Sequence, residues 1–207
     1  MIKVLVYGGK KNALSIGQFL EQRIPVEVNV MTSRMEFSEL STAQIVKETE
    51  DALCSQIGRN ELIVLADPLD AVVAEETLRT RYPRQKFVCY GQGLTRIIQR
   101  LEAVYILVAL KIRRLELYQR IKAQCQKTEI RETEGQEWKK LIENRRRTKE
   151  EVMRTVRLAQ GAPIVVFHPD FSCSEIKEIV DWRNEVIDLE EELLKSAKAE
   201  LGLMKWC

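Results

Sequence analysis

The single histidine of the chain, His168, stands at the end of the apolar, strand-like run PIVVF and is followed by Pro169 and Asp170. A helical pattern begins a few residues later, near residues 172–174. Strand-to-helix junctions are where α/β proteins tend to place catalytic groups and anion sites. Because an imidazole exchanges protons near neutral pH, this junction is a candidate active site. The alternative is a histidine that only satisfies its own hydrogen bonds.

Cysteine is the other residue type that could carry chemistry here. The chain has five cysteines, with no CxxC pair and no Cys/His ligand set, so the sequence predicts reduced thiols and no metal site. The glycine-containing stretch YGGKKN, residues 7–12, lacks the spacing of both the dinucleotide and the P-loop fingerprints. It predicts a turn and not a nucleotide-binding loop.

The elements that position these groups alternate between strand and helix. Apolar runs near residues 2–9, 26–31, 61–68 and 86–91 predict strands, and periodic segments at 14–24, 41–58 and 70–82 predict helices, with Ser41 as an N-cap and Gly58 at the helix end. The second half continues with strands at 103–110, 128–132, 163–167 and 185–189. Its helices are expected near 94–101, 112–125, 136–143, 149–160, 173–182 and 190–202. This βαβ series predicts parallel sheets flanked by helices, with a tight crossover at residues 91–93.

Composition limits the class of protein. The 207 residues are 45% hydrophobic and 31% charged, which is typical of an ordinary globular protein. The longest apolar stretch, residues 103–110, is too short to span a bilayer, and no signal-peptide pattern opens the sequence, so we expect a cytoplasmic protein without membrane contact. Residues 93–157 carry 17 Lys and Arg against 9 Asp and Glu. This excess predicts a solvated basic face, with nucleic-acid binding around Arg145–Arg147 and Lys149 as the weaker alternative.

The order of these segments resembles the aspartate/glutamate racemase family, and glutamate racemases above all. The resemblance spans nearly the whole chain. It rests on the opening strand and helix KVLVYGGKKNALSIG, on the strand and turn LIVLADP, on the second-lobe strand and helix AVYILVALKIRRLELYQR, and on GAPIVVFHPDFS near the end. It implies two pseudo-symmetric α/β lobes with parallel sheets, residues 1–92 plus 184–207 and residues 93–183.

The resemblance also implies a reaction without a cofactor. In that family two cysteines face each other across a cleft between the lobes, one removing the α-proton of the amino acid and the other returning a proton from the opposite side. In this chain the two cysteine positions hold Ala66 and His168. An alanine methyl cannot exchange a proton, so the pair is incomplete and no catalytic residue is expected.

Other positions of the family's site have changed as well. The former cleft would be lined by Tyr7, Gly8, Glu36, Phe37, Asp67, Pro68, Glu143, Pro169 and Asp170. Among them only Glu143, in LIEN, matches a supporting acid of the family. Tyr7 and Phe37 are bulky where small polar groups are expected, and Asp67 adds negative charge where a dicarboxylate would bind.

These replacements lead to two hypotheses of different kinds. The first is a racemase-like pseudoenzyme without cofactor or metal, which binds a protein partner or associates with itself as a dimer. The second is a cofactor-independent isomerase or lyase that acts on a small carboxylate or amino acid, with His168 assisted by Asp67, Asp170 or Glu143. An empty polar cleft would favour the second hypothesis, and closure of the cleft by Tyr7 and Phe37 would favour the first.

Overall fold

The computed structural model divides the chain into two compact units. The first contains residues 1–94 and 190–207, and the second contains residues 95–189. The structure describes residues 1–33, 40–66, 70–101, 103–108, 129–134, 161–167, 173–179 and 185–204.

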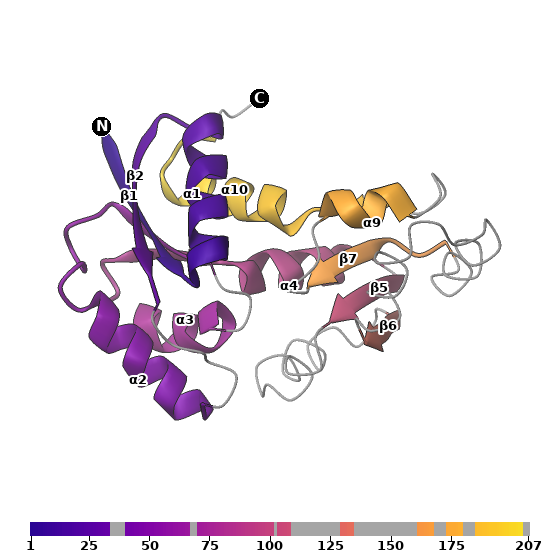
Figure 1. The fold of residues 1–207 in the computed structure, drawn as a ribbon, viewed down its shortest axis with the longest axis horizontal. Helices are drawn as coiled ribbons and strands as arrows, with labels where there is room; N and C mark the ends of the chain where they lie inside the picture. Colours follow the sequence, from indigo (N-terminus) through magenta and orange to yellow (C-terminus); the bar gives the residue numbers. More distant parts are fainter. Residues whose placement is uncertain are drawn as a thin grey trace. The chain divides into compact units, whose positions relative to one another are not determined.

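The first unit is built on a four-stranded parallel sheet (Figure 1). Its strands are β1 (Ile2–Gly8), β2 (Val26–Thr32), β3 (Leu62–Leu65) and β4 (Lys86–Cys89), in the order β2-β1-β3-β4. Its helices are α1 (Lys10–Arg23), α2 (Thr42–Leu53), α3 (Asp70–Arg81), the start of α4 (Tyr90–Arg100) and nearly all of α10 (Leu189–Glu200). The alternation predicted from the sequence is confirmed by these elements.

Hydrophobic side chains on both faces hold this sheet between the helices. One face carries Leu5, Tyr7, Ile63, Leu65, Phe87 and Cys89, which form a core with Leu53 of α2 and with Ala74 and Leu78 of α3. The other face is covered by α1, whose buried residues include Ile16 and Leu20. The start of α2 has the capping box expected at Ser41, because Ser41 and Gln44 bond each other's backbone amides.

The second unit contains another four-stranded parallel sheet. Its strands are β5 (Ala103–Val108), β6 (Glu129–Glu134), β7 (Ile164–Phe167) and β8 (Val186–Ile187), in the order β6-β5-β7-β8. Numbered within its own unit, each sheet has the order 2-1-3-4, so the predicted pseudo-symmetry is present at the level of topology. Helix α9 (Cys173–Ile179) lies between β7 and β8 in the sequence. The helices expected at 112–125, 136–143 and 149–160 lie outside the described residues.

Two details differ from the sequence prediction. Residues 185–189 were expected to return to the first lobe, but β8 pairs in parallel with β7 and belongs to the second sheet. Two strands joined by a helix tend to pair with each other in parallel. β7 and β8, which α9 connects, follow this local rule. The expected crossover at residues 91–93 is instead the first turn of α4, which begins directly after β4.

Among the described residues, no helix combines the length and the apolar character that crossing a membrane requires.

Candidate functional site

Ala66 and His168 directly follow equivalent strands of the two sheets in the sequence. Ala66 is the first residue after β3, and His168 is the first residue after β7. Each of these strands is the third strand of its unit and lies beside the central first strand. The shared topology supports the alignment that gives these two positions the same role. His168 itself lies outside the described residues, so its surroundings stay a prediction.

The surroundings of Ala66 are described in the first unit. Ala66 is fully buried, and its amide donates a hydrogen bond to the carbonyl oxygen of Tyr7 over 2.8 Å. The side chain of Tyr7, near the end of β1, packs into the core with Leu53 and Leu78, so its bulk lies in the layer between the sheet and α2 and α3. Gly8, the last residue of β1, accepts a bond from the amide of Ser33 over 2.7 Å.

Most of the other predicted cleft residues fall outside the described part of the chain. These residues are Glu36, Phe37, Asp67, Pro68, Glu143, Pro169 and Asp170. Whether they gather with Ala66 and His168 stays a prediction.

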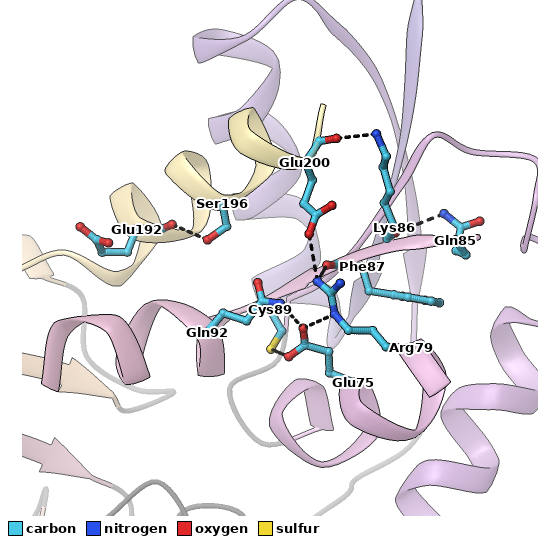
Figure 2. A network of polar contacts seen from close by, with 10 residues as sticks. All are labelled: Glu75, Arg79, Gln85, Lys86, Phe87, Cys89, Gln92, Glu192, Ser196 and Glu200. Atoms are coloured by element: carbon cyan, nitrogen blue, oxygen red, sulfur yellow. Dashed lines mark hydrogen bonds and ion pairs between the residues drawn. The ribbon is translucent and has the colours of Figure 1, made fainter. Parts of the chain in front are cut away.

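A polar network that the sequence analysis missed lies in the first unit, at the end of β4 (Figure 2). At its centre is the buried Glu75 of α3. The Cys89 thiol donates to Oε2 of Glu75 over 2.6 Å, the Arg79 guanidinium donates to Oε1 over 2.8 Å, and the Gln92 side-chain amide also donates to Oε1. Arg79 in addition contacts the Phe87 carbonyl and reaches Oε1 of Glu200, 3.3 Å away. The network joins α3, β4, α4 and α10.

The electrostatics of this network keep Cys89 protonated. Complete burial, followed by the charge of Glu75 and the hydrogen bond to it, raises the pKa of the Cys89 thiol well above its ordinary value of 9.0. In the second unit, burial and then Asp188 raise the pKa of Cys173 to about 11. A thiolate is the reactive form of cysteine, so neither group is prepared for proton abstraction near neutral pH.

A partial signal for this network was present in the sequence. Glu75 and Arg79 are four residues apart, which indicates an ion pair on one face of a helix. Such pairs are usually solvated, and nothing in the spacing reveals that Cys89, Gln92 and Glu200 approach them. Among the residues that the structure describes, no group of three or more His, Cys, Asp or Glu side chains could hold a metal ion.

Comparison with solved structures identifies the architecture. A glutamate racemase isoform from Bacillus anthracis superposes with a TM-score of 0.71 at 11% identity, over 98% of this chain and 82% of that one. The chain has the fold of the aspartate and glutamate racemases. Glutamate racemase from Francisella tularensis in complex with D-glutamate superposes with a TM-score of 0.70 at 14% identity, over 100% of this chain and 84% of that one. An aspartate racemase homologue from Pyrococcus horikoshii superposes with a TM-score of 0.62 at 14% identity, over 97% of this chain and 100% of that one.

The sequence comparisons add no relative to this racemase-fold chain. No family profile matches the sequence, and no curated protein matches it. At 11–14% identity the structural likeness establishes the fold and leaves the activity open.

Proposed function

We propose that this protein is a racemase-fold pseudoenzyme that does not racemise amino acids and acts by binding a protein partner or a second copy of itself. The observation that carries the proposal is the residue type after the third strand of each sheet. Two-base racemisation needs an ionisable group on each side of the α-carbon. Ala66 provides none, and it is fully buried.

No described thiol is suited to replace the missing base. Cys89 is on the strand next to β3, but its side chain points into the core and donates to Glu75. The raised pKa of this buried thiol keeps it neutral. Cys54 is exposed at the end of α2, beyond the amino-terminal side of β3. None of the described thiols is therefore both ionised near neutral pH and placed at the carboxyl end of the first sheet.

A second candidate function rests on His168, which directly follows β7. An imidazole there could act as a single base in an isomerase or lyase reaction on a small carboxylate, with Asp67, Asp170 or Glu143 as a helper. This reaction needs one proton-transferring group and not two, so it is compatible with Ala66.

The experiment that separates these functions is exchange of the α-proton in D₂O, followed by NMR over a panel of amino acids and hydroxy acids. A glutamate racemase of the same fold serves as the positive control. We expect no exchange with the wild-type protein. Exchange that disappears in His168→Ala would favour the second function. Exchange that persists in His168→Ala would show that other residues act and would contradict both assignments.

The same proposal includes a cytoplasmic location and independence of cofactors. The location is supported by the free thiols of Cys54, Cys89 and Cys173, which fit a reducing compartment. The independence of cofactors rests on the resemblance to the racemases. Cell fractionation with an antibody against the protein tests the location directly.

A further inference from the structure

The two edge strands of the first sheet are covered to different extents. At β4, the Arg79 guanidinium donates to the Phe87 carbonyl, and the Lys86 ammonium donates to the Glu200 carbonyl over 2.5 Å (Figure 2). The Arg79 side chain of α3 and the end of α10 therefore lie against this edge. At β2, four of seven residues are exposed, including Val30, whose relative exposure is 38%. An exposed edge strand is a template for pairing with another strand.

The hydrogen bonds around β2 show which backbone groups face outward. The amide of Ser33 donates to Gly8 of β1, so the odd-numbered amides of β2 point toward the sheet. The amides of Val26 and Val28 bond instead to the Ile24 carbonyl and to Oε1 of Glu21, the latter over 3.3 Å. Even-numbered amides therefore point away from β1. Those of Val30 and Thr32 have no partner among the described residues.

One stripe of α1 lies beside this edge. Lys10, Leu14, Gly17 and Glu21 are spaced by four, three and four residues, so they share one face of the helix. Gly17 places this face of the helix against β2, because a Cβ at Gly17 would lie only 2.9 Å from Cγ2 of Val30. Leu14 has a relative exposure of 43%. The other exposed large hydrophobics of the described residues are Met1 and Met204, near the chain ends. Away from the ends, the two that the described part of the chain exposes, Leu14 and Val30, are therefore both at this edge.

We propose that β2 pairs antiparallel with β2 of a second copy of this chain, about a two-fold axis at Val30. Val30 then faces Val30 of the partner, and Val28 faces Thr32 of the partner, so the outward backbone groups satisfy each other. The two sheets become one continuous eight-stranded sheet. This inference holds whether or not the protein has catalytic activity.

Charge complementarity selects a second copy as the occupant. The two-fold axis that reverses β2 also makes the two α1 helices antiparallel on the same face of the joined sheet. Lys10 at the start of one stripe then lies opposite Glu21 at the end of the other, with Leu14 of both copies between them. Lys10 and Glu21 are both exposed, and the two-fold axis places an oppositely charged pair at each end of the interface. Glu21 exchanges its long bond with the Val28 amide for the partner's ammonium group.

The proposal is tested by sedimentation velocity on the full chain over a wide range of protein concentrations. We expect the wild type to form dimers and Val30→Lys to weaken them strongly, because two ammonium groups would meet at the axis. Val30→Thr is the matched control, since it keeps a β-branched side chain at the edge. A wild type that stays monomeric into the hundreds of micromolar, or dimers that tolerate Val30→Lys, would overturn the proposal.

Charge reversal distinguishes this interface from a general loss of folding. Lys10→Glu and Glu21→Lys should each raise the dimer dissociation constant about tenfold, and the double variant should restore it to within about threefold. Lys11→Glu is the control, because Lys11 is exposed on the same turn but off the stripe. Failure of the double variant to recover, or an equal effect of Lys11→Glu, would contradict the antiparallel arrangement.

Discussion

The thiol of Cys89 donates a hydrogen bond to the carboxylate of Glu75 over 2.6 Å, with the sulfur completely buried. The pair lies at the end of β4, where a parallel sheet usually presents groups to a ligand. Here both side chains are used inside the protein. Glu75 is fixed by donors from three elements, and Cys89 lies in the core between the sheet and α3. The pair therefore stabilises the first unit and is not available to a substrate.

Replacing Arg79 by Met should destabilise the protein substantially. The change leaves the Glu75 carboxylate, whose side chain is 11% exposed, with only neutral donors. We expect a loss of about 2–3 kcal/mol in the free energy of unfolding, less than for a fully buried pair because a third of the Arg79 side chain is exposed. Urea denaturation measures this loss. Adding Glu75→Gln to Arg79→Met should recover part of it, because the unpaired charge is removed.

A solvated ion pair of the same unit is the control for Arg79. Arg23 and Glu191 are 2.9 Å apart, with side chains 50% and 41% exposed. Glu191→Gln should cost less than about 1 kcal/mol. Equal losses for Glu191→Gln and Arg79→Met would show that burial of Glu75 does not set the cost.

Stability should fall as the pH rises above 9.0. The pKa of Cys89 is raised in the folded state by burial and by Glu75, so above its ordinary value of 9.0 the unfolded chain releases a proton that the folded chain keeps. The limiting slope is about 1.4 kcal/mol per pH unit for one retained proton. In Cys89→Ser, which keeps a donor to Glu75, the free energy of unfolding measured by urea denaturation should decline less steeply with pH. Exposed Cys54→Ser should leave the decline unchanged, and an unchanged slope in Cys89→Ser would refute this explanation.

Much of the fold follows from local sequence patterns. The buried strands β1, β3 and β4 are short apolar runs that end at glycine, proline or a helix start, and Ser41 with Gln44 marks the beginning of α2. Helix boundaries were less accurate. α1 begins at Lys10 and not at residue 14, because the first turn, KKNA, has no apolar face that periodicity could reveal.

Features that depend on distant contacts could not be predicted in the same way. Glu75 and Arg79 look like a surface pair until Cys89 and Glu200 are placed beside them. The pairing of β8 involves only two residues, too few for a pattern to assign them to a sheet. For the candidate site, the resemblance related Ala66 to His168, and the shared strand order supports that relation.

Replacing Gly93 by Val should loosen α10. A Cβ at Gly93, in the first turn of α4, would lie 3.0 Å from the Cβ of Glu192 in α10, and a Cβ cannot rotate away. We expect a loss of about 2 kcal/mol, since overpacking exceeds the gain from removing a helical glycine. Hydrogen exchange should report faster exchange of the α10 amides. Ser15→Val, at an exposed position of α1, is the control for the β-branched residue, and unchanged protection of α10 in Gly93→Val would rule out this close contact.

Glutamate should not stabilise this protein against thermal unfolding. A ligand that binds only the folded state raises stability by RT ln(1 + [L]/Kd), so a weak ligand leaves the melting temperature unchanged. Ala66 offers no polar group to a substrate, and Asp67 adds a negative charge next to it, which should repel a dicarboxylate. Differential scanning fluorimetry with millimolar L- and D-glutamate measures the effect. Asp67→Asn tests the charge by itself and should restore little binding, because Ala66 is unchanged. A rise of several degrees for the wild type with either enantiomer would mean that the protein binds the amino acid of the glutamate racemases whose fold it shares, and the proposal of a pseudoenzyme would have to be abandoned.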